Sequence, residues 1–185
     1  MQMHAAALLV ASGVLVELSA ADARQVVSQM HFQHFNPGDV IIREGEAVHN
    51  DFMALVLNGE VTVESSLAAA QDSIVVSVLG PGSLVGEIGL IDNTPRAATC
   101  TAASDLLLAV LPRQAMQQLM AENQGVAARL LLAMAKRLAD QLRETTRKLV
   151  TFAQVTKALQ QELAAAHSVN QRLLDRENAL PSAAV

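Results

Sequence analysis

The chain has neither tryptophan nor tyrosine, and only one cysteine, Cys100, among its 185 residues. A single thiol cannot build a disulfide framework or a thiolate metal cluster within one chain, which fits a reducing compartment. We therefore interpret Cys100 as a small, half-buried residue. Since 51% of the residues are apolar, the chain can bury a core, and its length predicts one domain, or one domain with an appendage.

Lysine is absent from residues 1–112, where three arginines face twelve acidic residues, a net charge of −9. Residues 113–185 carry ten basic and six acidic residues, a net charge of +4. This asymmetry indicates two differently built segments.

No hydrophobic run is long enough to cross a bilayer. Residues 5–16 (AAALLVASGVLV) come closest, but no basic residue precedes them and Glu17 follows directly. They predict a buried amphipathic helix ending near Gly13. A second helix over residues 20–30 is predicted to be capped by Ser19. We expect a soluble, cytoplasmic protein without membrane contact.

Short runs of Val, Ile and Leu alternate with turn signals between residues 36 and 111. Strands are predicted over residues 40–44, 52–58, 60–65, 73–79, 97–102 and 106–111. The Asn58-Gly59 pair predicts a hairpin between the second and third of these strands, because a type I′ turn needs positive φ at both central positions. The pattern predicts an α+β protein with a small antiparallel barrel or jelly roll.

After Pro112 the composition predicts one long helix. Its apolar positions follow a heptad, with Ala135 and Asn170 both at position a. A buried asparagine there favours a parallel, in-register two-stranded coiled coil, hence a homodimer, whereas Glu177 at a core position indicates fraying. The alternative is a helix that folds back on its own domain. The heptad core positions are Leu131, Ala135, Leu138, Leu142, Thr145, Leu149, Phe152, Thr156, Leu159, Leu163, Ala166, Asn170, Leu173, Glu177 and Leu180.

Enzymatic chemistry finds no support in the sequence. The five histidines show no metal-ligand spacing on a helix and no nucleophile partner, so we predict neither a metal site nor a catalytic site. Arg129, Lys136 and Arg143 recur every seven residues. Such a series is more typical of a solvated helix face than of a nucleic-acid contact.

One run carries chemistry, the segment GEIGLIDNTPRAAT over residues 86–99. A short helical turn at Glu87 directs free backbone N–H groups at whatever lies before it. The guanidinium of Arg96 offers parallel donors to two phosphate oxygens, and Glu87 suits a sugar hydroxyl. The alternative is a surface salt bridge between Glu87 and Arg96.

Three stretches, FNPGDVIIREGE, DFMALVLNGEVTVES and VLGPGSLVGEIGLIDNTPRAATCTA, together resemble the cyclic nucleotide-binding domain family. The resemblance implies N-terminal helices over residues 1–31, a ligand-binding β-roll over 32–120, a dimerisation helix over 121–180 and a tail over 181–185. It also implies that Glu87 accepts from the ribose 2′-hydroxyl and that Arg96 clamps the cyclic phosphate. The backbone around Gly86, Ile88, Gly89, Leu90, Ala97 and Ala98 would complete the phosphate cradle, and Val76, Ser77 and Val85 would line the purine.

Ala97 directly follows the arginine, where family members selective for cyclic GMP place a threonine. Cyclic AMP is therefore the expected ligand, with cyclic GMP as the alternative. Because Trp and Tyr are absent, the aromatic lid of protein kinase A domains is missing. The resemblance to the catabolite activator protein assigns the base contact to Thr145 and Thr146 on the dimer helix.

Residues 150–185 contain no helix-turn-helix pattern, so sequence-specific DNA binding is not predicted. The cysteines of an iron–sulfur sensor are missing, and the intact anion segment argues against a haem sensor. We expect a non-enzymatic cyclic nucleotide receptor that signals to an unidentified protein partner through a ligand-dependent conformational change. The alternatives are a dimeric adaptor whose pocket is vestigial or takes another anion, and a fragment of a transcription regulator.

Overall fold

The computed structural model describes residues 1–11, 17–47, 51–66, 73–92 and 94–178. The chain divides into two compact units, Met1–Arg137 and Leu138–Val185. The first unit contains all the strands of the described residues, and the second is the distal part of one long helix.

The first unit contains two four-stranded sheets with antiparallel pairing, which confirms the predicted antiparallel strands. One sheet has the order β1-β8-β3-β6, formed by His31–Phe35, Leu106–Pro112, Phe52–Asn58 and Leu84–Val85. The other has the order β2-β7-β4-β5, formed by Val40–Ile42, Thr99–Ala102, Val61–Ser66 and Ser73–Leu79. Six of these strands were predicted, whereas β1 and β6 were not. Closure into a barrel stays a prediction.

The predicted hairpin at Asn58-Gly59 is wrong, because β3 and β4 belong to different sheets. Gly59 has a φ of 84°, and a Cβ there would collide with the carbonyl oxygen of Asp105. The next residue donates its N–H to Ser104 Oγ at 3.0 Å. Gly59 is therefore a corner that packs against the loop before β8 and sends the chain into the second sheet.

Two helices precede the sheets, α1 (Gln2–Ala11) and α2 (Ala20–Ser28). Ser19 caps α2 as predicted, since its hydroxyl oxygen accepts from the N–H of Asp22 at 3.2 Å and Asp22 accepts in return from the Ser19 N–H at 3.0 Å. The predicted end of the first helix near Gly13 lies outside the described residues.

The predicted uninterrupted helix after Pro112 is instead a pair, α4 (Arg113–Glu122) and α5 (Gln124–Asn178). Asn123 separates them: its N–H donates to the Leu119 carbonyl at 2.8 Å, and its side-chain oxygen accepts from Val126 N–H at 3.3 Å. Asparagine suits such a position because its short side chain replaces missing helix bonds. No helix of the described residues has both the length and the apolar character that crossing a membrane requires. The predicted tail, residues 181–185, lies outside the residues that the structure describes.

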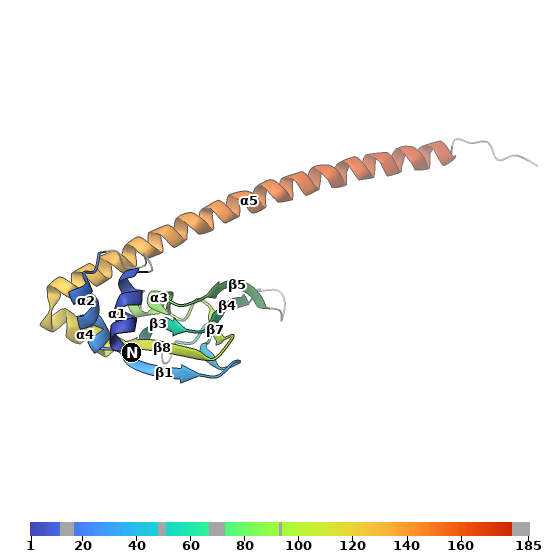
Figure 1. Ribbon diagram of the computed structural model, residues 1–185. Helices are drawn as coiled ribbons and strands as arrows, with labels where there is room; N and C mark the ends of the chain where they lie inside the picture. Colours follow the sequence, from blue (N-terminus) through green and yellow to red (C-terminus); the bar gives the residue numbers. More distant parts are fainter. Residues whose placement is uncertain (12–16, 48–50, 67–72, 93, 179–185) are drawn as a thin grey trace, which may run out of the picture. The chain divides into compact units, whose positions relative to one another are not determined.

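Buried residues form two clusters in the first unit. The larger lies where α1, α2, α4 and the start of α5 meet β3 and β8 (Figure 1). The smaller is built from strand residues, with Ile42, Val56 and Leu108 among its buried members. The helices therefore pack against β3 and β8. The smaller cluster is shared by strands of both sheets.

Ion pairs fix the start of α5 to the helices before the sheets. Asp22 is 7% exposed, and its carboxylate accepts from Arg129 Nε at 2.9 Å and Nη2 at 2.6 Å. Lys136 pairs with Glu17. The third member of the seven-residue series, Arg143, pairs with Asp140 at 2.6 Å. The side chains of Arg129 and Lys136 are 46% and 57% exposed, as expected of a solvated face, and both also form ion pairs within the first unit.

Candidate functional site

Arg96 lies between a short helix, α3 (Glu87–Asp92), and β7, and is only 5% exposed. Its main chain is pinned to the turn after β2. The N–H of Arg96 donates to the Glu46 carbonyl at 3.1 Å, and the Arg96 carbonyl accepts from Gly45 N–H at 2.8 Å. The turn at Gly45 therefore sets the position from which the guanidinium projects.

The guanidinium of Arg96 contacts neutral groups. Nη1 donates to the Gly86 carbonyl at 2.8 Å, and Nη2 donates to the Phe52 carbonyl at 3.0 Å. The Phe52 ring lies 4.7 Å from the guanidinium carbon, within cation–π range. Burial lowers the pKa of Arg96 from its usual range. The negative charges of Asp51 and Glu46 oppose that shift, but the guanidinium itself is bonded to carbonyl oxygens and to no carboxylate.

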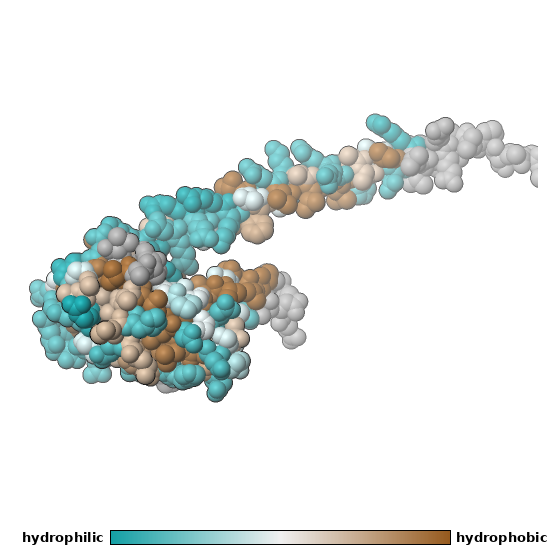
Figure 2. Space-filling model, in the orientation of Figure 1, coloured by the Kyte–Doolittle hydropathy of each residue, from teal (hydrophilic) through white to brown (hydrophobic). Residues whose placement is uncertain are grey.

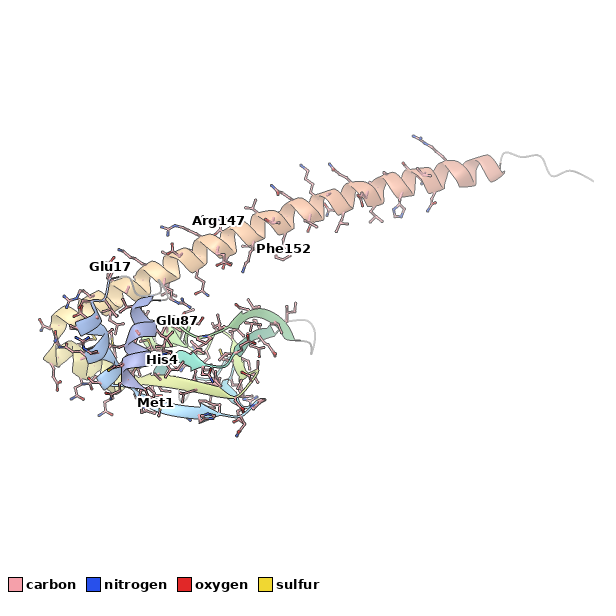
Figure 3. The ribbon with its side chains drawn as sticks, viewed as in Figure 1. Met1, His4, Glu17, Glu87, Arg147 and Phe152 are labelled. Atoms are coloured by element: carbon pink, nitrogen blue, oxygen red, sulfur yellow. The ribbon has the colours of Figure 1, made fainter. Side chains whose placement is uncertain are left out.

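Glu87 begins α3 and is 6% exposed (Figure 3). Burial raises the pKa of its carboxyl group above the usual value, while the positive charges of Arg137 and Arg96 oppose that shift. Both Glu87 and Arg96 belong to the described residues, and they form no ion pair with each other. The surface salt bridge weighed above is therefore wrong.

Gly86 joins these two residues through a backbone that only glycine adopts easily. Its φ is 76°, and a Cβ built on it would lie 2.6 Å from Arg96 Nη1 and 3.1 Å from the Phe52 carbonyl oxygen. A side chain at this position would displace the guanidinium.

Arg137, on α5, is the charged neighbour of Glu87 that the sequence analysis missed. Its charge acts on Glu87 more strongly than that of Arg96 does. Its Nε is buried without a hydrogen-bond partner in the described chain. The available signal was helical spacing: Leu130 and Met134, seven and three residues earlier, are both fully buried, so Arg137 continues the face of α5 that meets the domain.

The other predicted cradle residues surround this centre. Gly89 and Leu90 are buried within α3, while Ile88 is 40% exposed. Ala97 is exposed, and Ala98 is partly exposed. Leu90 N–H donates to the Gly86 carbonyl at 3.3 Å, so that carbonyl is shared between α3 and Arg96.

The predicted purine-lining residues lie in two environments. Val85 is 2% exposed within the smaller apolar cluster. On β5, Val76 is 61% exposed, and Ser77 pairs with Val63 of β4. Ser77 is exposed as well, and the register of the β4–β5 pairing shifts at this point, so that Val76 has no partner on β4. Their contacts with a purine stay predictions.

Thr145 and Thr146 lie exposed on α5 in the second unit. Their hydroxyls donate to the carbonyls of Gln141 and Leu142, each at 2.9 Å. Both are thus bonded within their own helix, and the role of base lid stays a prediction.

A cavity of about 320 Å³ lies beside the guanidinium. It is lined by residues 40–42 of β2 together with Arg43, Glu46, Phe52 and Arg96, so Arg96 is the one predicted site residue that it contains. Cys100, on β7, is buried rather than half-buried, and burial together with the nearby charge of Glu87 raises the pKa of its thiol to about 11. It therefore stays a neutral thiol.

Comparison with known proteins gives one consistent result. Residues 32–123 match the family model described as the cyclic nucleotide-binding domain. A cAMP-dependent protein kinase regulatory subunit of Hypocrea atroviridis is 32% identical over 117 residues, which are 63% of this chain and 23% of that protein. The chain thus spans about a quarter of the length of the curated relatives it first matches.

Two solved structures show the same fold. A cyclic nucleotide-binding domain from Methylobacillus flagellatus is 25% identical with a TM-score of 0.67, covering 78% of this chain and 84% of that one. The regulatory domain of Toxoplasma gondii PKA, crystallised with cAMP, is 27% identical with a TM-score of 0.60, covering 73% and 49%.

Proposed function

Residues 32–123 belong to the cyclic nucleotide-binding domain family, and we propose from this premise that the chain is a cyclic AMP receptor that dimerises through α5. In the proposal Arg96 holds the cyclic phosphate, Glu87 accepts from the ribose 2′-hydroxyl, and the backbone of residues 86–90 and 97–98 completes the cradle. Ala97 supports cyclic AMP over cyclic GMP because it supplies no hydroxyl to guanine.

The observation that carries the proposal is the hydrogen bonding of Arg96. The residue is 5% exposed, and its guanidinium is bonded to two carbonyl oxygens rather than to a carboxylate, so that the negative charges of Asp51 and Glu46 act on it without a hydrogen bond. A bidentate phosphate would supply a directly bonded negative charge. The Gly86 and Phe52 carbonyls would then keep the guanidinium in position beside the phosphate.

Calorimetry of the full chain with cyclic AMP and cyclic GMP tests this function. We expect cyclic AMP to bind more tightly. An absence of heat and of competition at millimolar ligand would reject the receptor and leave the dimeric adaptor. That adaptor is favoured by one observation, since the cavity beside Arg96 omits Glu87 and β5.

The proposed dimer rests on two distinct apolar faces of α5. The first faces the domain core with Val126, Leu130 and Met134, which are at most 2% exposed. The second is the heptad seam, whose members Leu142, Leu149, Phe152, Leu159 and Leu163 are between 60% and 68% exposed. Hydrophobic residues gather along the distal part of α5 (Figure 2), and Arg147 and Phe152 project from different sides of it (Figure 3).

Because the core-facing side is already used, the seam needs another partner. A second copy of the chain supplies an identical stripe, and Asn170 at position a favours parallel, in-register pairing. A helix of 55 residues is about 80 Å long, which extends the seam far beyond the length of a small domain.

Arg137 supports a route from ligand to helix. It projects from α5 and acts on Glu87 within the first unit. A ribose hydroxyl that engages Glu87 would change what Arg137 faces, and the helix would respond if the two dimer geometries differ in ligand affinity. We propose that the output passes to a protein partner.

For the base lid, Thr145→Ala together with Thr146→Ala should weaken cyclic AMP binding, and equal affinity would discard that role.

A further inference from the structure

One segment of α5 is nearly free of charge. Residues 158–171 read ALQQELAAAHSVNQ, and Glu162 and His167 are the sole ionisable side chains among them. On one helix, side chains interact three or four residues apart. The residues three and four positions from Glu162 are alanine and leucine. The residues three and four positions from His167 are leucine, alanine, asparagine and glutamine. Neither group has a charged neighbour on its own helix.

The contacts in the structure agree with this isolation. His167 is exposed, and its Nδ1 lies 3.2 Å from the carbonyl oxygen of Leu163. When Nδ1 donates to that carbonyl, Nε2 remains available, and it has no partner in the described part of the chain. Glu162 is exposed and likewise makes no hydrogen bond or ion pair with the residues described.

The heptad puts these two groups on opposite flanks of the seam. With Ala135 at position a, Glu162 occupies g and His167 occupies e. In a parallel, in-register coiled coil, each g residue faces the e residue five places further along the partner helix. In an antiparallel pair g faces g and e faces e, so carboxylate would meet carboxylate.

We propose that Glu162 of each chain pairs with the partner's His167 across a parallel coiled coil, so that the dimer tightens as the imidazole becomes protonated. The proposal rests on the homodimer inferred above. The facing helix presents Leu163, Asn170 and Glu162 near the ring, and Glu162 alone among these is charged. The nearest charges on the same helix, Lys157 and Arg172, lie beyond the neighbouring turns. Imidazole is the side chain whose charge changes between pH 5 and 8.

The test is sedimentation equilibrium of the full chain at low salt, at pH 7.5 and pH 5.5. Two symmetric pairs should lower the dimer dissociation constant at pH 5.5 by about three- to five-fold. Leu159→Ala in every variant brings a very tight dimer into the measurable range.

Matched variants separate this pair from other titrating groups. His167→Gln and Glu162→Gln should each abolish the change with pH, whereas His34→Gln, an exposed histidine on β1, should retain it. His167→Lys should give the tighter dimer at both pH values. Persistence of the full pH effect in both glutamine variants would overturn the pair.

Orientation is tested by cross-linking. Ala166→Cys, in a Cys100→Ser background, places a thiol at core position d, and oxidation should yield a covalent dimer in a parallel arrangement. A dimer that fails to cross-link there overturns the pair but leaves dimerisation intact. A chain that stays monomeric at every concentration and pH overturns the proposed dimer as well, so the two failures are distinguishable.

Discussion

The Nη1 of Arg96 and the carbonyl oxygen of Gly86 are 2.8 Å apart, so the residue expected to bind a phosphate is held by the glycine that begins the predicted phosphate-binding segment. The bond requires glycine, because a Cβ at residue 86 would lie 2.6 Å from that nitrogen. Backbone conformation and charge placement are therefore linked at this point of the molecule.

Gly86→Ala should weaken both folding and ligand binding. The φ of 76° and the contact with Arg96 together should cost about 1–3 kcal/mol of unfolding free energy, measured by urea denaturation. Gly80→Ala is the matched control, because a Cβ there meets no atom within 4 Å. Equal stability of the two variants would show that residue 86 tolerates a side chain.

Arg96→Leu should reduce cyclic AMP affinity by about 3–5 kcal/mol, the range for losing one partner of a buried charge pair. Calorimetry measures the loss. Arg43→Leu is the control, since this exposed arginine lines the same cavity. An unchanged dissociation constant in Arg96→Leu would remove the residue from the site.

Glu87→Gln should change how stability depends on pH. Burial raises the pKa of Glu87 in the folded chain above the ordinary 4.5, so the folded state retains this proton more readily than the unfolded state. Its stabilising effect is complete below pH 4.5 and is lost as pH rises through the folded pKa. Relative to Glu87→Gln, the natural chain should therefore lose stability as pH rises above 4.5, which urea titrations at a series of pH values measure. Parallel curves would contradict the raised pKa.

Asp22→Ala should destabilise the first unit by about 1–3 kcal/mol, because it removes the carboxylate that accepts from the Ser19 N–H and hydroxyl and leaves Arg129 without its partner. The pKa of Asp22 is lowered to about 2, chiefly by Arg129, so its stabilising effect is present above pH 3.8 and is lost as pH falls through 2. Thermal unfolding between pH 2 and pH 6 measures it. Asp140→Ala, which breaks an exposed pair, should leave the melting temperature nearly unchanged.

Leu149→Glu should convert the proposed dimer to a monomer, since it places a carboxylate at core position a of the predicted heptad. Light scattering after size exclusion reports the mass. Val150→Glu is the control, because this residue is similarly exposed, 53% against 63%, but lies outside the seam. Dimers of equal strength in both variants would rule out the proposed register.

Local chemistry made parts of the fold predictable from sequence. Ser19 followed by Asp22 specifies a capping box without tertiary context, and the valine-rich runs marked six strands. Asn58-Gly59 misled because positive φ specifies a sharp turn, while the choice between hairpin and corner depends on the distant loop at Asp105. The strand HFQHF of β1 has no clean alternation, so pairing with β8 alone defines it.

The site was predictable to the extent that its residues are contiguous. Glu87 and Arg96 lie nine positions apart in one segment, and both are buried in the structure. Arg137 was not found because its nearness to Glu87 depends on how α5 packs on the domain. The side of β5 that carries Ser77 likewise depends on a register shift in its pairing with β4.

The start of α5 has a buried side and an exposed side, and both carry leucine. Leu130 and Met134 are fully buried in the core, whereas Leu132 is 49% exposed, and successive helix residues are separated by about 100°. Rotation of the helix about its own axis would therefore expose Leu130 and Met134 as it covered Leu132. Axial rotation of this part of α5 is thus opposed by the packing of its buried side.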